Sequence, residues 1–250
     1  YSEDTTLGSS SVPFINDSLV IAASRSTDLP ASLKVGDAEV AFVSSVRNLG
    51  VTLDCNLTMS DHVQNICKAA YIQLRQIGAI RHLLTQQATQ TLVSAFVLSR
   101  LDYCNSLLSG CPKYLLNKLQ RVQNAAARLV CKARKSDHIT PILHSLHWLP
   151  ISSRIQYKLS CICFNSFSGF APRYLSELLH IYTPSRQLRS SADTRVYRIP
   201  TVRTKTLGQR AFIYQGPVTW NGLPLSVRHS DSILSFRSNV KTHLFVDVYC

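Results

Sequence analysis

Two blocks of sequence decide how this chain folds: residues 97–109 read VLSRLDYCNSLLS, and residues 120–130 read QRVQNAAARLV. The second block lies in a predicted helix that starts at about Pro112 and runs to about Ala133. One side of this helix is apolar at the 3.6-residue period, carrying Leu115, Leu119, Val122, Ala126, Leu129 and Ala133. Another side is basic, carrying Lys118, Arg121, Arg128 and Lys132. We expect the apolar side to pack on the preceding helices.

The basic side of this helix allows two interpretations. A stripe of charge on a helix is usually a solvated face. Here, however, the helix contains no acidic residue that could neutralise the stripe from one turn away. The alternative role is therefore contact with nucleic-acid phosphates.

Helical periodicity extends to both sides of these blocks. A first helix is predicted after Ser60, with an apolar face of Val63, Ile66, Ala70, Leu74 and Ile77. Thr85 is expected to cap a second helix, with an apolar face of Ala88, Leu92, Ala95, Phe96 and Ser99. Further helices are predicted at 139–146, 151–167, 172–180 and 232–246, with Gly169 as a C-terminal stop.

Strand-like patterns are short and lie near the two ends of the chain. Residues 33–35 and 40–43 flank a turn that contains glycine, which predicts a hairpin. Residues 46–53 predict a third strand, and residues 196–199 alternate like a strand. The expected fold class is mainly α: a helical thumb-like bundle with a small N-terminal β element and a mixed α/β C-terminal tail.

The charge of the chain is strongly positive and unevenly distributed. Its 27 Lys and Arg and 14 Asp and Glu give a net charge of +13. Residues 1–60 hold three basic and seven acidic side chains, whereas residues 61–135 hold eleven basic and two acidic ones. Between 186 and 210, only Asp193 opposes Arg186, Arg189, Arg195, Arg198, Arg203, Lys205 and Arg210. This cluster either binds nucleic acid or is neutralised within the chain. A merely basic globular protein would show the same overall balance.

Composition indicates a folded, intracellular protein. Hydrophobic residues make up 45% of the chain and charged residues 16%, which argues against wholesale disorder. The first residues do not resemble a signal peptide, and no stretch reaches 18 apolar residues. We therefore expect no membrane partner, no secretion, and a nuclear and cytoplasmic location. The eight cysteines are expected to be reduced and structural.

The two opening blocks, together with Leu49-Gly50-Val51-Thr52-Leu53-Asp54 and Leu146-His147-Trp148-Leu149-Pro150, resemble a known family. They are similar to the C-terminal part of reverse transcriptases from non-LTR retrotransposons, LINE-like elements of the jockey type. The resemblance covers about residues 33–246. It implies a primer-grip-like strand at Leu49, Gly50 and Val51. It further implies three parts: a remnant of the polymerase palm (1–56), a helical thumb-like domain (57–135) and a basic C-terminal domain (136–250).

The catalytic aspartates of that family have no counterpart in this chain. The family uses an Asp-Asp dipeptide, whereas the only adjacent acidic pair here is Glu3-Asp4. Because two-metal phosphoryl transfer needs carboxylates that converge on both ions, we predict no catalytic residue and no polymerase activity. Mg²⁺ is expected only in the complete polymerase, which includes the missing upstream palm and fingers. The resemblance implies a fragment that grips the template–primer duplex and binds RNA, DNA or an RNA–DNA hybrid. The alternative is a non-enzymatic structural or interaction domain from a decayed element.

Other candidate sites favour structural roles. His138, His144 and His147 suggest a metal site, but no Cys-x-x-Cys or zinc-finger spacing accompanies them, and we predict no metal ligand. Cys161 and Cys163 fall on different faces of a helix. Trp148 and Trp220 could stack on bases, but their apolar neighbours favour core packing. The chain contains neither a Gly-x-Ser-x-Gly elbow nor a phosphate-binding glycine loop.

Overall fold

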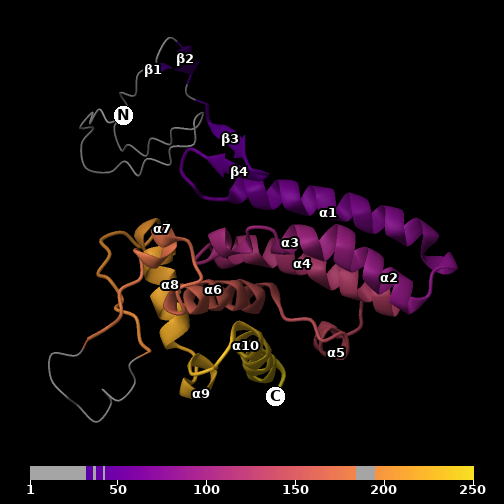
Figure 1. The fold of residues 1–250 in the computed structure, drawn as a ribbon. Coiled ribbons are helices and arrows are strands. Elements are labelled where there is room, and N and C mark those ends of the chain that lie inside the picture. The colour runs from indigo at the N-terminus through magenta and orange to yellow at the C-terminus, as the bar shows by residue number, and fades with distance from the viewer. Residues whose placement is uncertain (1–31, 36–37, 42, 184–194) are drawn as a thin grey trace. The chain divides into compact units, whose positions relative to one another are not determined.

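The computed structural model describes residues 32–35, 38–41, 43–183 and 195–250, and most of these residues are helical, as the sequence predicts (Figure 1). The strands are β1 (Ser32–Val35), β2 (Ala38–Ala41), β3 (Ser45–Asn48) and β4 (Val51–Asp54). The helices are α1 (Ser60–Ile80), α2 (Gln86–Val93), α3 (Ser99–Asp102), α4 (Lys113–Cys131), α5 (Ile139–Ser145), α6 (Ile151–Phe167), α7 (Arg173–Ser176), α8 (Phe212–Asn221), α9 (Leu225–Arg228) and α10 (Ile233–Tyr249). The chain divides into two compact units, Tyr1–Asn65 and Ile66–Cys250. The predicted domain boundary between residues 135 and 136 falls inside the second unit.

The first unit contains two antiparallel hairpins. The pairing of β1 with β2 confirms the hairpin predicted from residues 33–43. The single strand predicted at 46–53 is wrong, because this stretch folds back on itself as β3 and β4. Leu49 and Gly50 form the two-residue turn, with φ angles of 45° and 82°. Two central residues with positive φ are the hallmark of a type I′ turn. A leucine in the first position hides that signal in the sequence.

β4 is tied to the start of α1 by side-chain hydrogen bonds. The Thr52 backbone N–H donates to Nδ1 of the buried His62 at 3.3 Å. The Asp54 carboxylate accepts hydrogen bonds from the backbone N–H groups of Thr58 and Met59, both at 2.8 Å. Burial acts to raise the pKa of Asp54, but these hydrogen bonds outweigh it and lower that pKa. The aspartate of the Leu-Gly-Val-Thr-Leu-Asp block therefore shapes the loop that leads into α1.

Most helix ends in the second unit lie where local sequence predicts them. Thr85 is the N-cap of α2, and its hydroxyl accepts a hydrogen bond from the Ala88 N–H. The limits of α6 are those predicted, and Gly169 follows it with a φ of 76°. Four members of the predicted apolar stripe of α4, Leu115, Leu119, Val122 and Ala126, are fully buried. Leu129 is half-buried, and Ala133 lies beyond the end of the helix. Pro112 is the N-cap of α4 rather than its first residue.

The buried face of the α2–α3 segment differs from the predicted one. A π-helical stretch, Ser94–Leu98, joins α2 to α3. Leu98 is buried, as are Thr89, Val93, Val97 and Leu101, whereas Phe96 is exposed. Thr89, Val93, Val97 and Leu101 recur every four residues, and the wide π turn keeps them on one side. The predicted face assumed uninterrupted 3.6-residue periodicity and is wrong for this reason.

Residues of the two sequence blocks, 97–109 and 120–130, hold helices together. Asp102 forms a two-point ion pair with Arg154, which joins α3 to α6; the Arg154 Nε to Asp102 Oδ1 distance is 2.7 Å. Gln123 is fully buried in α4 and donates to the carbonyl oxygen of Leu149 at 2.8 Å. Gln120 accepts a hydrogen bond from the N–H of the first residue of α6 at 2.9 Å. These polar contacts fix α6 against α3 and α4.

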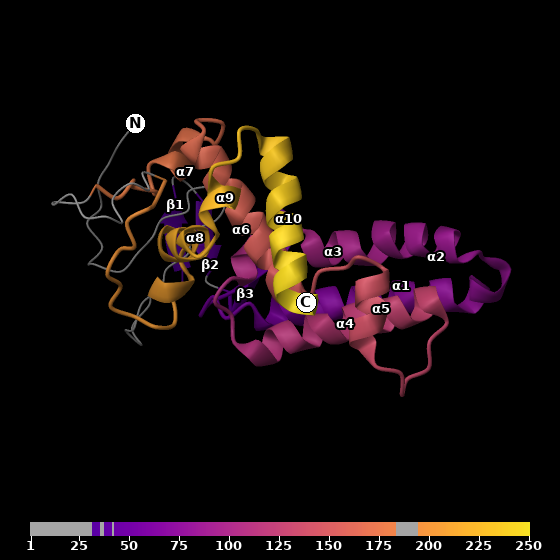
Figure 2. The same cartoon turned by 90° about the horizontal axis from the view of Figure 1, so that it is seen from below.

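An aromatic core lies between α6, α8 and α10, and α6 packs against both of the other helices (Figure 2). The rings of Phe164 and Phe236 stack with centroids 4.4 Å apart, and the Phe167 and Trp220 rings stack at 6.2 Å. Trp220 is fully buried and Trp148 is also buried, which confirms core packing for both tryptophans. The predicted strand at 196–199 is reduced to one isolated bridge between Ile181 and Tyr197.

Candidate nucleic-acid interface

An open groove of about 590 Å³ lies between α1 and α4 within the second unit. Five of its lining residues come from α1 and two from α4: Lys68, Tyr71, Leu74, Arg75, Gly78, Ala125 and Leu129. We call this site the α1–α4 groove. The two helices run lengthwise beside each other in Figures 1 and 2. The groove places an apolar floor between basic side chains, which is an arrangement suited to a polyanion with apolar parts.

The α1 wall of the groove presents an aromatic ring with one cation on each side of it. Lys68, Tyr71 and Arg75 are spaced three and four residues apart, so they lie on one face of the helix. All three side chains are exposed, whereas Leu74 is buried beneath them. Ala70 and Ile77 are also buried and anchor α1. The apolar stripe of α1 therefore holds the basic face outward.

The α4 wall carries part of the basic stripe predicted from the sequence. Lys118, Arg121 and Lys132 are exposed, and helical geometry places Arg121 one turn before the groove residue Ala125. Lys118 lies near the Cys67 thiol of α1: burial raises the pKa of that thiol, and the Lys118 charge acts to lower it. The Lys118 ammonium also lies 6.0 Å from the centre of the Tyr114 ring.

Arg128, the fourth member of the predicted stripe, is used inside the protein. It is half-buried, and one of its guanidinium nitrogens donates to the carbonyl oxygen of Asp137 at 3.2 Å. Nearby, the buried Arg81 donates to the carbonyl oxygens of Leu129 and Val130, both at 2.9 Å. Arg81 thus satisfies carbonyl groups at the C-terminal end of α4 and complements the helix dipole there. Arginines at this end of α4 serve the fold.

The cations that border the groove are not neutralised within the described part of the chain. The ion pairs found there are Arg154 with Asp102 and Arg173 with Glu177. Lys68, Arg75 and Arg121 take part in neither of them. As far as the described residues go, the groove is consequently a site of unpaired positive charge, which favours an anionic ligand.

The second predicted basic cluster separates into distinct groups. Arg186 and Arg189 lie outside the described residues. Arg195 is half-buried; it donates to the carbonyl oxygen of Arg228 at 2.9 Å and lies 5.4 Å from the centre of the Phe167 ring. Arg210 is also half-buried. Its side chain lies against Gly110, where an added Cβ atom would be 2.9 Å from the Arg210 Cγ atom.

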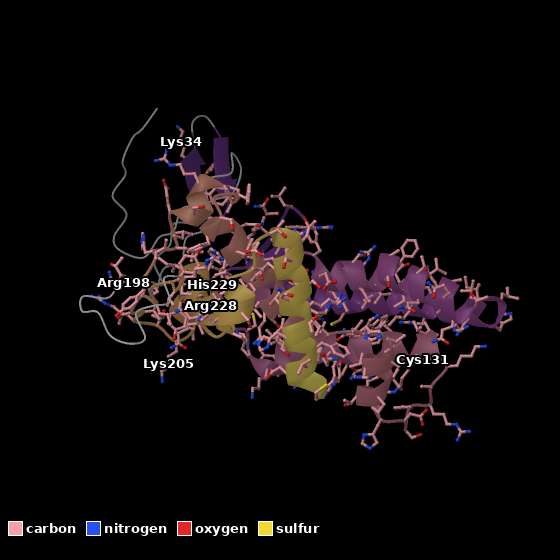
Figure 3. All side chains as sticks on the ribbon, turned by 60° about the horizontal axis from the view of Figure 1, so that its bottom comes forward. Lys34, Cys131, Arg198, Lys205, Arg228 and His229 are labelled. Carbon is pink, nitrogen blue, oxygen red and sulfur yellow. The ribbon has the colours of Figure 1, made fainter. Side chains whose placement is uncertain are left out.

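Three members of that cluster, Arg198, Arg203 and Lys205, are exposed, and we call them the C-terminal basic cluster. Figure 3 labels Arg198 and Lys205 at one end of the second unit, with Cys131, the last residue of α4, towards the other end. The C-terminal basic cluster and the far end of α4 are therefore separate surfaces.

The primer-grip-like residues have unequal surroundings. Leu49 is 76% exposed at the tip of the β3–β4 hairpin, and Gly50 is also exposed. Val51 begins β4 and is buried. The tip of the hairpin thus exposes the Leu49 side chain and the backbone of Gly50, while the buried Val51 anchors β4.

The histidines and cysteines are placed as structural groups. His144 lies against the rings of Phe245 and Tyr249, with centroid distances of 5.2 and 5.5 Å. In the described ranges, no group of three or more histidine, cysteine or acidic residues could hold a metal ion. All eight cysteines are free thiols. Burial raises the pKa of the Cys163 and Cys161 thiols, as expected for inert core cysteines.

Sequence reasoning missed the α1 half of the groove. Its signal is the Lys-x-x-Tyr-x-x-x-Arg spacing from Lys68 to Arg75, which borders the apolar stripe at Leu74. That spacing becomes meaningful only when α4 brings a second basic helix beside it. Within the described residues, no helix has the length and apolar character required to span a membrane. Comparison of the chain with protein family models, curated proteins and solved structures found no match.

Proposed function

We propose that this chain is a nucleic-acid-binding part of an RNA-directed DNA polymerase of the non-LTR retrotransposon type. In this proposal the α1–α4 groove holds the phosphate backbone of the template–primer duplex, in the manner of a polymerase thumb. The observation that carries the proposal is the set of uncompensated cations, Lys68, Arg75 and Arg121, on two adjacent helices. The partner is RNA, DNA or an RNA–DNA hybrid, and the place of action is the nucleus and cytoplasm of a cell.

The electrostatic argument is that few acidic groups are available to oppose these cations. Residues 61–135 contain only two acidic residues, Asp61 and Asp102. Asp102 is already paired with Arg154. Within residues 61–135 the positive charge is therefore largely unopposed, which favours the binding of an external anion. A phosphate backbone supplies closely spaced charges and releases counterions on binding, so the affinity should depend steeply on salt.

Catalysis belongs to another part of the polymerase in this proposal. The chain has no Asp-Asp pair, and the Mg²⁺ ions of polymerisation would be held by carboxylates of the upstream palm. The retrotransposon assignment rests on the sequence blocks. Asp102 and Gln123, which belong to those blocks, fix α6 to its neighbours, so the blocks support a shared fold rather than shared chemistry.

A second candidate function is a non-enzymatic interaction domain. Large apolar side chains are exposed around α7, where Phe170 is 78% and Tyr174 is 67% exposed. Exposed aromatic side chains of this kind are common at protein-binding surfaces. This function requires no affinity for nucleic acid, so a binding measurement separates the two candidates.

The test is a charge-removing double variant, Arg75→Gln with Arg121→Gln, in the full chain. Its control is Arg100→Gln with Lys113→Gln, which removes the same charge from exposed positions that do not line the groove. Binding to a fluorescein-labelled RNA–DNA hybrid is measured by anisotropy at several salt concentrations. The groove variant should lower the slope of log affinity against log salt by about two, at roughly 0.9 per phosphate contact. Equal slopes for the two variants would refute the proposal.

A further inference from the structure

The floor of the α1–α4 groove differs from a surface that contacts only phosphates. Between its basic edges lie Leu74, Gly78, Ala125 and Leu129, whose side chains carry no hydrogen-bonding group. The ring of Tyr71 stands beside them and is 38% exposed. A base-paired duplex presents phosphates and sugars on its outside and keeps its base faces stacked within, so it would leave this floor unused.

The position of Tyr71 suits a nucleobase. Lys68 precedes Tyr71 by three residues and Arg75 follows it by four, so the ring has one cation about one turn away on each side. From the rise of 1.5 Å per residue, the two cations start about 10.5 Å apart along α1. An aromatic face between two phosphate-binding side chains is the pattern by which proteins hold unpaired strands.

The size and chemistry of the groove restrict the class of ligand further. Its volume of about 590 Å³ is in the range of pockets that hold small ring systems. Its floor offers no donor or acceptor to the edge of a base, so bases would be recognised by their ring faces alone. Stacking of this kind tolerates every base. The expected ligand is therefore unpaired nucleic acid without sequence preference.

We infer that the α1–α4 groove binds an unpaired segment of RNA or DNA, with a base stacked on Tyr71 and its phosphates on Lys68, Arg75 and Arg121. The inference deepens the proposed function and rests on it, because the same cations bind phosphate in both. It adds that the template–primer duplex reaches the groove at an unpaired end, so that the backbone phosphates bound by these cations belong to a single strand.

The test compares two labelled 12-nucleotide strands that carry the same phosphates. One is oligothymidine, and the other has abasic sites at all internal positions. The full chain should bind oligothymidine about tenfold more tightly, because a stacked base adds affinity that phosphates do not supply. Tyr71→Ala should remove most of this difference. Tyr114→Ala is the matched control, since Tyr114 is exposed on α4 and does not line the groove.

A variant that fills the groove tests the inference without changing Tyr71. Ala125→Leu adds a side chain to the groove floor and leaves every charge in place. It should weaken oligothymidine binding and leave binding of the abasic strand unchanged. Equal binding of both strands by the unmodified protein would overturn the inference. If the Arg75→Gln, Arg121→Gln variant still weakened binding to both strands, the proposed function would survive that result. If that variant bound both strands like the unmodified protein, the proposed function and the inference would fail together.

Discussion

The hydrogen bond between His62 in α1 and Thr52 in β4 depends on the protonation state of the His62 ring. The ring is buried, its Nδ1 accepts the Thr52 N–H, and its Nε2 is buried without a partner among the described residues. Burial lowers the pKa of His62. A proton on Nδ1 would replace the acceptor with a second donor facing the Thr52 N–H. The neutral ring is therefore the form that supports the fold.

We expect the free energy of unfolding to fall as the pH is lowered through about 6.5, the usual pKa of histidine. The unfolded chain binds a proton at His62 more readily than the folded chain, so acid favours unfolding. For one group the slope is at most about 1.4 kcal/mol per pH unit. Urea unfolding at pH 7.5 and 5.5 measures the effect. His62→Gln should reduce this pH dependence, whereas His138→Gln, at an exposed position, should leave it unchanged. Equal pH dependence in all three proteins would rule out His62 as its source.

The packing of α8 on α6 depends on a close approach at Gly216. A Cβ atom at this position would lie 3.2 Å from the Cys163 sulfur and 3.2 Å from a ring carbon of Phe212. Gly222, at the end of the same helix, has more room, and a Cβ atom there would lie 3.5 Å from the nearest atom, the Val218 carbonyl oxygen. The two glycines therefore differ in what they contribute. Gly216 allows close contact between α8 and α6, whereas Gly222 is the C-cap residue of α8.

We expect Gly216→Leu to destabilise the protein by about 1–3 kcal/mol, because overpacking forces α8 away from α6. Gly222→Leu should change the free energy of unfolding by less than about 1 kcal/mol, since this position is exposed. Chemical denaturation of both variants, followed by tryptophan fluorescence, gives the comparison directly, because Trp220 lies in the core that α8 helps to form. Similar losses at the two positions would contradict the packing argument.

The second unit carries two separate basic surfaces. The α1–α4 groove and the C-terminal basic cluster come from different helices and loops, and Figure 3 shows Arg198 and Lys205 far from Cys131. The described C-terminal residues that serve the fold, Arg195 and Arg210, are half-buried and are not part of that cluster. If both surfaces bind phosphate, they should do so independently, since distant sites add their effects.

We expect Arg198→Gln with Lys205→Gln to lower the salt slope of hybrid binding by about two, at roughly 0.9 per phosphate contact. When these two substitutions are combined with Arg75→Gln and Arg121→Gln, the salt slope should fall by about four. Anisotropy titrations of the two double variants and the fourfold variant at matched salt concentrations measure additivity. A Ser226→Ala variant, at an exposed position without charge, serves as the control. No change from the C-terminal pair alone would show that this cluster is only a solvated face.

Local sequence was enough to predict most of the longer helices, several of their caps and much of the buried stripe of α4. Thr85 and Ser232 both act as N-caps through their hydroxyl groups, and Gly169 ends α6 in a left-handed conformation. Capping and turn formation depend on the chain within four residues, so such features are visible before the fold is known. The same is true of the apolar stripe of α4, because helical periodicity selects one face regardless of what covers it.

Tertiary structure alone decided which charges remain available and where a groove forms. Arg128 and Arg195 resemble Arg121 in sequence, yet their guanidinium groups donate to backbone carbonyls, of Asp137 and of Arg228 respectively. The π-helical turn moves the buried face of α2–α3 away from the one that regular periodicity predicts. The groove exists because α1 and α4, about fifty residues apart in the sequence, lie side by side. The physical reason is that burial and pairing depend on neighbours brought together by folding, whereas helix formation depends mainly on adjacent residues.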